Sequence, residues 1–108
     1  MKRKKIGEIG VDGGQAMVCD PCYIESEWKS SDLPQDLGKG PRTHEFSYDG
    51  CCRETLSKDM AGQLNYKMGH AGAGVAFSTG WGDGVYPVYA TYNEEGRIVK
   101  VEVLFDEE

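Results

Sequence analysis

The sequence predicts an α+β fold that is mainly β, in which one antiparallel sheet of about five strands is accompanied by one helix. Apolar and polar residues alternate over several short segments, and turns rich in glycine, aspartate, asparagine and proline separate these segments. Only the stretch 51–64 carries apolar residues at helical spacing. Because strands and helices do not alternate along the chain, a parallel sheet is not expected.

Length and charge limit the class of protein. The 108 residues suit a single domain, 1–108, with one modest core. The formal net charge is −6, although residues 2–5 are all basic, so we expect a basic N-terminal tail at 1–4 and an acidic tail at 106–108. An acidic body lacks the continuous basic surface that binds nucleic acid or anionic membranes, and neither is expected as a partner.

No apolar run follows the basic start, and no segment approaches the length needed to span a membrane. The sequence therefore predicts a cytoplasmic protein, in which a disulfide framework is not expected. The four cysteines lie in two groups that are close in sequence, Cys19 with Cys22 and Cys51 with Cys52. Adjacent cysteines seldom bind one zinc ion together, so we expect buried inert thiols, no bound metal and no cofactor.

The first part of the chain predicts an N-terminal hairpin. Alternation indicates strands at 5–11 and 15–19, and the residues between them, Asp12-Gly13-Gly14, favour a turn. Pro21 ends the second strand because proline has no N–H to donate to a ladder. Asp20 stands at this strand end. Its carboxylate either caps the turn or points into a cleft, and the sequence leaves both interpretations open.

The middle of the chain is less regular. Residues 26–43 predict a long loop, which we expect Trp28 to hold against the body. Alternation over 44–48 indicates a short strand, after which Asp49 is a candidate N-cap. The helix is expected over Cys51–Leu64. Its apolar stripe recurs at four-residue spacing and consists of Leu56, Met60 and Leu64.

The last third predicts a meander of three strands, at 75–79, 85–92 and 97–105. A polar turn at 93–96 separates the last two. The last strand alternates most regularly, so we expect one of its faces to be core. The apolar residues of that face are Val99, Val101, Val103 and Phe105.

A glycine-rich stretch, residues 69–88, includes the first turn of this meander. Asp83-Gly84 is typical of a hairpin turn, because glycine tolerates a positive φ. The glycines exceed the needs of one tight turn, so the stretch is either a wide turn or a loop whose backbone approaches a ligand. Trp81 lies in the turn, where its own hairpin cannot bury it, and is the preferred ligand contact. His70 is either a solvated histidine or a ligand contact.

Three segments carry a resemblance to a known family: VDGG at 11–14, CDPCY at 19–23 and STGWGDGVYPV at 78–88. They are similar to small phage and bacterial proteins described only as a domain of unknown function, with an early D-P-C-Y element and a late S-T-G-x-G-D-G-x-Y-P-V hairpin. The resemblance covers nearly the whole chain apart from 26–43. It implies a compact domain, often phage-encoded, and no reaction. Small phage domains of this kind include some that sequester host nucleotide signals.

The residue types favour a non-catalytic binding domain for a small-molecule ligand that is anionic or nucleotide-like. Backbone amides exposed by glycines bind phosphates or carboxylates, aromatic faces stack on a base or ring, and arginine pairs with an anion. No catalytic residue is assigned. The candidate ligand-binding residues are Asp20, Tyr23, Arg53, His70, Thr79, Gly80, Trp81, Gly82, Asp83, Tyr86 and Arg97.

Two other functional classes stay open. A small hydrolase or metal-dependent enzyme would use Asp20, His70 and Asp83, which would then have to converge within hydrogen-bonding reach of one substrate. A protein-interaction or inhibitor module would use the acidic surface. An open strand edge would favour self-association into a homo-oligomer.

Overall fold

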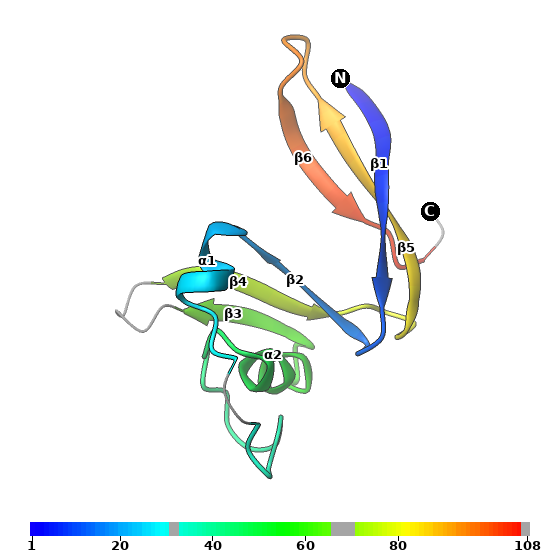
Figure 1. Ribbon diagram of the computed structural model, residues 1–108. Coiled ribbons are helices and arrows are strands. Elements are labelled where there is room, and N and C mark those ends of the chain that lie inside the picture. The colour runs from blue at the N-terminus through cyan, green and yellow to red at the C-terminus, as the bar shows by residue number, and fades with distance from the viewer. Residues whose placement is uncertain (31–32, 66–70, 107–108) are drawn as a thin grey trace. The chain divides into compact units, whose positions relative to one another are not determined.

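The computed structural model describes residues 1–30, 33–65 and 71–106. The chain divides into two compact units, each treated by itself below (Figure 1). The terminal unit combines Met1–Gly14 with Thr79–Glu108, and the central unit is Gln15–Ser78. Each unit contains one three-stranded antiparallel sheet. The expectation of one domain over 1–108 stays a prediction.

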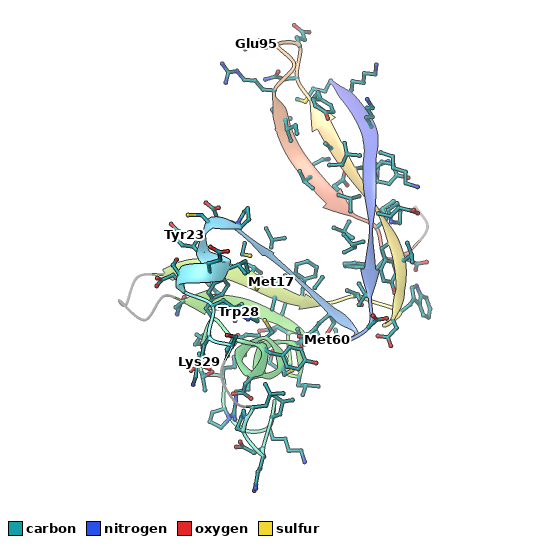
Figure 2. All side chains as sticks on the ribbon, viewed as in Figure 1. Met17, Tyr23, Trp28, Lys29, Met60 and Glu95 are labelled. Atoms are coloured by element: carbon teal, nitrogen blue, oxygen red, sulfur yellow. The ribbon has the colours of Figure 1, made fainter. Side chains whose placement is uncertain are left out.

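The sheet of the terminal unit has the order β1-β5-β6. Its strands are β1 (Lys2–Val11), β5 (Gly84–Tyr92) and β6 (Ile98–Val103). β1 pairs with β5 along nearly its whole length, from Lys2 opposite Tyr92 to Val11 opposite Gly84. A tight turn joins β5 to β6, and its tip carries Glu95 (Figure 2). The side chain of Asn93 closes this turn by accepting hydrogen bonds at 3.0 Å from the backbone N–H groups of Glu95 and Arg97.

The basic residues at the start of the chain belong to this sheet. The expectation of a basic N-terminal tail at 1–4 is wrong, because β1 begins at Lys2. The guanidinium carbon of Arg3 lies 3.9 Å from the ring centroid of Tyr89 on β5, and its Nε donates to Glu102 on β6 at 3.1 Å. Arg3 therefore links all three strands through a cation–π contact and an ion pair.

The sheet of the central unit has the order β2-β4-β3. Its elements are β2 (Gln15–Cys19), α1 (Cys22–Ser26), α2 (Tyr48–Thr55), β3 (Ala61–Asn65) and β4 (Ala71–Ser78). α2 packs against β3 and β4. No helix in the described part of the chain is long and apolar enough to cross a membrane. The buried core consists of Phe46, Cys51, Leu64, Ala73 and Ala76, and half-buried Met17, Cys19, Tyr23 and Trp28 pack against it (Figure 2).

The structure corrects the predicted strand pairing. The segments expected as an N-terminal hairpin lie in different sheets, since β1 pairs with β5 and β2 pairs with β4. β4 and β5 are also in different sheets, so only the β5–β6 part of the predicted meander is confirmed. Glycine-rich turns indicate where strands end, whereas long-range packing selects their partners. The described chain therefore has six strands in two sheets rather than about five in one.

The helix prediction is half right. α2 covers Tyr48–Thr55, its N-cap is Ser47 rather than Asp49, and Leu64 belongs to β3. Leu56 and Met60 are exposed, so their four-residue spacing does not mark a buried stripe. Residues 44–48 contribute isolated bridges and the start of α2 instead of a strand. The sequence did not predict α1, which takes Ser26 out of the expected loop.

The predicted core face of the last strand is also corrected. Val99 and Val101 are 51% and 56% exposed, whereas Val103 and Phe105 are half-buried. Regular alternation identifies a strand, but it does not establish that another layer covers the apolar face. Within the part of the chain that the structure describes, both helices belong to the central unit.

Gly50→Ala should destabilise the central unit, although this exchange inside a helix normally stabilises it. A Cβ atom at position 50 would overlap the backbone carbonyl of Glu45, which cannot move aside like a side chain. We expect a loss of about 1 to 3 kcal/mol in the free energy of unfolding, measured in urea. Gly10→Ala is the control, because its Cβ would meet nothing within 4 Å. Equal stability of the two variants would contradict the steric assignment.

Candidate functional site

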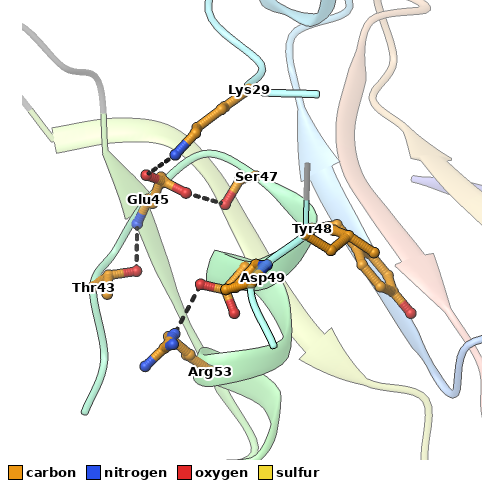
Figure 3. A pocket seen from close by; sticks show the side chains of 9 residues that line it. Lys29, Thr43, Glu45, Ser47, Tyr48, Asp49 and Arg53 are labelled. Atoms are coloured by element: carbon orange, nitrogen blue, oxygen red, sulfur yellow. Dashed lines mark hydrogen bonds and ion pairs between the residues drawn. The ribbon is translucent and has the colours of Figure 1, made fainter. Parts of the chain in front are cut away.

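The central unit contains a polar cavity of about 250 Å³ at the start of α2 (Figure 3). We call it the polar cavity. Its walls come from two stretches that are distant in sequence: the segment after α1, and the stretch that runs from Thr43 into α2. The lining residues are Lys29, Leu33, Pro34, Thr43, Glu45, Ser47, Tyr48, Asp49 and Arg53.

A short parallel bridge between Lys29 and Ser47 positions the first wall. The backbone N–H of Lys29 donates to the carbonyl of Phe46 at 2.9 Å. The neighbouring Trp28 packs edge-on against the ring of Phe46, with centroids 5.1 Å apart. This agrees with the anchoring role that the sequence predicts for Trp28. Lys29 is therefore held beside the N-cap of α2 by a backbone hydrogen bond and by the packing of half-buried Trp28 on buried Phe46.

Glu45 lies between a cation and a hydroxyl. Lys29 Nζ is 3.3 Å from Glu45 Oε2, and Ser47 Oγ donates to Glu45 Oε1 at 2.7 Å (Figure 3). The same Ser47 hydroxyl accepts from the backbone N–H of Gly50 at 2.9 Å and so caps α2. The side chains of Lys29 and Glu45 are 45% and 36% exposed, so water screens their ion pair and it contributes little stability.

Asp49 and Arg53 form the second charged pair, one turn apart on α2. Arg53 Nε donates to Asp49 Oδ2 at 2.8 Å, and Asp49 Oδ1 accepts from the backbone N–H of Gly38 at 2.8 Å. Arg53 also reaches the Asp36 carboxylate and the Pro41 carbonyl, each at 3.3 Å. The guanidinium thus ties the 36–41 segment to α2, and its side chain is only 9% exposed.

These contacts shift the pKa values of both groups. Burial acts to raise the pKa of Asp49, but the hydrogen bonds from Gly38 and Arg53 outweigh it and hold the pKa below its ordinary value. The hydrogen bond to Asp49 raises the pKa of Arg53, and Asp36 adds to this effect. Arg53 is a structural cation, whereas Lys29 is the cation of the polar cavity that can exchange its partner.

The candidate residues predicted from the sequence are divided between the two units. Arg53 is the one that lines the polar cavity, and His70 lies outside the described residues. The central unit also holds Asp20 and Tyr23. The terminal unit holds the remaining candidates, Thr79, Gly80, Trp81, Gly82, Asp83, Tyr86 and Arg97.

The glycine loop at 79–84 is closed by its own hydrogen bonds. Thr79 Oγ1 and Tyr86 Oη each donate to the Gly82 carbonyl at 2.7 Å, and the Gly82 N–H donates to the Thr79 carbonyl at 3.2 Å. The expectation that the Gly82 amide is open to a ligand is therefore wrong. Gly80 has φ +59°, and its Cβ would lie 2.9 Å from Phe105 Cβ, so glycine is required by both conformation and packing.

Trp81 projects from this loop and is 75% exposed, as its position between two glycines predicts. It borders a shallow groove of about 440 Å³ in the terminal unit. Tyr86 also borders this groove but is buried, with its ring edge-on to Phe105 at 5.1 Å. Arg97 is placed apart from this groove, at the turn between β5 and β6. The remaining groove residues are Val85, Pro87, Tyr89, Leu104, Phe105 and Asp106.

Asp20 and Tyr23 have structural surroundings. Asp20 Oδ1 accepts from the backbone N–H of Cys22 at 2.9 Å, which is the turn-capping interpretation of this carboxylate. Tyr23 packs against the buried core of the central unit. The Cys51 thiol is also in this core, where burial raises its pKa to about 12 and keeps it protonated. Among the described residues, no group of three His, Cys, Asp or Glu side chains is placed to hold a metal ion.

Sequence reasoning missed Lys29, Glu45, Ser47 and Asp49 as residues of one site. Ser47 followed by Asp49 is a local N-terminal helix signal, and it could have placed the start of α2. Lys29 carries no such signal, because its contact with Glu45 depends on a long-range bridge.

A second ionic cluster lies at the end of α2. The Glu54 side chain is fully buried, with Oε2 3.4 Å from His44 Nδ1 and Oε1 3.7 Å from Arg42 Nε. Neither Glu54 oxygen accepts a hydrogen bond from the described residues. His44 Nδ1 is also 2.9 Å from the Gln63 carbonyl. This cluster joins α2 to β3, and it does not line the polar cavity.

Asp49→Asn should lower the free energy of unfolding at neutral pH by about 1 to 3 kcal/mol, because it removes a charged acceptor from two hydrogen bonds. Since the folded-state pKa of Asp49 is lowered, its contribution is present above the ordinary value and is lost as pH falls through the folded value. The variant should therefore lose less stability than the native protein below about pH 4. Urea unfolding across this range measures it, and parallel pH profiles would contradict the assignment.

Trp81→Ala should change the free energy of unfolding by less than about 1 kcal/mol, because the side chain is 75% exposed. Tyr86→Ala in the same groove should cost about 3 kcal/mol or more, because it removes a buried ring and leaves the Gly82 carbonyl with fewer donors. Both values come from urea unfolding. An equal loss in the two variants would show that Trp81 is packed.

Comparison with known proteins identifies one family. A family model described as "Protein of unknown function (DUF4241)" matches residues 2–103 of the chain. No curated protein and no solved structure matches the chain.

Proposed function

Because the chain belongs to the DUF4241 family, whose description assigns no activity, we propose from the geometry of the polar cavity that it is a non-catalytic binding domain for a small anionic ligand. One observation carries the proposal. An exchangeable lysine, Lys29, shares one cavity with the hydroxyls of Thr43 and Ser47 and with the first residues of α2.

These groups suit an anion for a physical reason. The start of a helix carries partial positive charge, and an ammonium group beside it adds a full one. Among the described residues, the ammonium group of Lys29 contacts one partner, the Glu45 carboxylate, in a half-exposed ion pair. A phosphate or carboxylate on a ligand would replace Glu45 at little cost, since an exposed pair of this kind contributes at most about 1 kcal/mol.

The acidic residues of the cavity limit the ligand further. Glu45 and Asp49 provide acceptors for hydroxyl or amino groups, so a ligand with both an anion and such donors fits better than a bare polyanion. The volume of about 250 Å³ lies just below the range of roughly 300 to 1,000 Å³ that is typical of ligand sites. A nucleotide-like ligand would place its sugar and phosphate in the cavity and leave its base outside.

Lys29→Ala should remove ligand-induced stabilisation while leaving the fold intact, since its side chain is 45% exposed. The probes are inorganic phosphate and adenosine 5′-monophosphate, and the measurement is the melting temperature with and without each. A ligand that binds only the folded state raises stability by mass action. The native protein should therefore have a higher melting temperature with adenosine 5′-monophosphate, which carries both the anion and hydroxyl donors. The variant should show no shift.

Lys58→Ala is the matched control, because Lys58 is an exposed lysine of the same unit that does not line the polar cavity. It should keep the native shift. If the native protein gives no shift with either probe, or if Lys29→Ala and Lys58→Ala respond alike, the polar cavity is not an anion site.

We also propose that the domain is phage-encoded and cytoplasmic. In that setting it would act by sequestering a host nucleotide signal. The enzyme alternative with Asp20, His70 and Asp83 gains no support from the described residues, because the Asp20 carboxylate caps its own turn. An interaction module with an acidic surface stays the third alternative.

A further inference from the structure

β6 is an open edge of the sheet in the terminal unit. Within the described chain, only β5 pairs with it, through Val88 opposite Val103 to Tyr92 opposite Ile98. Its exposed apolar side chains are Ile98 at 53%, Val99 at 51% and Val101 at 56%. An exposed edge with apolar side chains presents backbone N–H and C=O groups to another strand.

We infer that β6 is a self-association surface, along which a second copy of this chain adds its own β6 in antiparallel orientation. In the register that we assign, Val101 lies opposite Val101 of the second copy. The terminal-unit sheet of one copy and that of the other then become one continuous sheet with the order β1-β5-β6-β6-β5-β1. This inference does not depend on the proposed ligand site, which belongs to the central unit.

Symmetry limits the registers of such a pair. Two antiparallel strands related by a two-fold axis keep their faces on the same sides only if that axis is perpendicular to the sheet. A residue then faces its own copy at the axis, and side chains directly opposite share one face. For β6, the registers with the longest overlap place either Lys100 or Val101 on the axis.

Charge selects between these two registers. With Lys100 on the axis, the two lysines lie directly opposite each other, which is destabilising. With Val101 on the axis, each Lys100 lies opposite Glu102 of the other copy, and each Val99 lies opposite Val103. A lysine on an edge strand normally opposes pairing. Of the two registers, only the one with Val101 on the axis places Lys100 opposite a carboxylate. This charge complementarity identifies a second copy as the occupant.

The other edge of the same sheet is less suited to pairing. β1 has a register irregularity between Lys5 and Gly7, near its middle, and such bulges disrupt a ladder. In β6, the irregularity falls at Val99, near one end of the strand, because Thr91 lies opposite Lys100 and Tyr92 opposite Ile98; Lys100–Val103 remains regular. The carboxylate of Glu102 already lies 3.5 Å from Lys100 of its own chain and 3.1 Å from Arg3. The pairing would place four alternating charges around the axis.

Sedimentation velocity over a wide concentration range tests this inference on the full chain. The native protein should form dimers, and Val101→Lys should raise the dissociation constant at least about tenfold, because it places two lysines opposite each other. Val85→Lys is the control, an exchange of another exposed valine, 65% exposed, outside β6. A native protein that stays monomeric throughout, or equal weakening by both exchanges, would overturn the inference.

A mixing experiment tests the register even if one exchange perturbs the monomer. Lys100→Glu alone and Glu102→Lys alone each place like charges opposite one another, so each variant should dimerise at least about tenfold more weakly than the native chain. Mixing the two restores both oppositely charged pairs, and hetero-dimers should form with near-native affinity. Circular dichroism checks that each variant is folded. Failure of the mixture to associate, or undiminished dimers of either variant alone, would exclude the Val101 register.

Discussion

The Ser47 hydroxyl is the interaction on which the central unit depends most. It accepts from the Gly50 N–H and donates to Glu45, so one group both starts α2 and orients a wall of the polar cavity. The close packing of Gly50 on the Glu45 carbonyl keeps these partners in register. Lys29 reaches the same point through its bridge to Ser47. The geometry of the cavity is therefore a consequence of how the helix begins.

The periodicity of the sequence was sufficient to locate β5 and β6, because their alternation is regular and a polar turn joins them. The periodicity did not indicate which strands pair with each other, nor whether another layer covers an apolar face. The same two-residue period describes a strand whose apolar face is buried and one, like β6, whose Val101 is exposed. In the stretch 51–64, the buried side chain of Leu64 belongs to β3, and a period of four residues arose by chance across a helix and a strand.

The candidate site was predictable only where its chemistry is local. Asp20 caps the next turn, and Trp81 is exposed by its glycine neighbours; both can be inferred from adjacent residues. The pairing of Lys29 with Glu45 depends on a bridge between distant segments, and no local pattern indicates it. The sequence predicts Arg53 as a partner for a ligand anion, but two carboxylates of the chain hold its guanidinium in place. Composition identifies charged residues without revealing which of them are already neutralised.

The order of strands along the chain has a consequence for synthesis on the ribosome. β1 is made first, yet its partner β5 follows only after the whole central unit, since Lys2 pairs with Tyr92. The central unit begins and ends with a paired couple, Gln15 opposite Ser78, and so all of its strands are complete before β5 emerges. Domains generally fold as units during translation, and contacts between distant residues form slowly. The nascent chain should therefore carry an unpaired β1 until β5 has been made, and the lysines and arginine of β1 oppose aggregation in that interval.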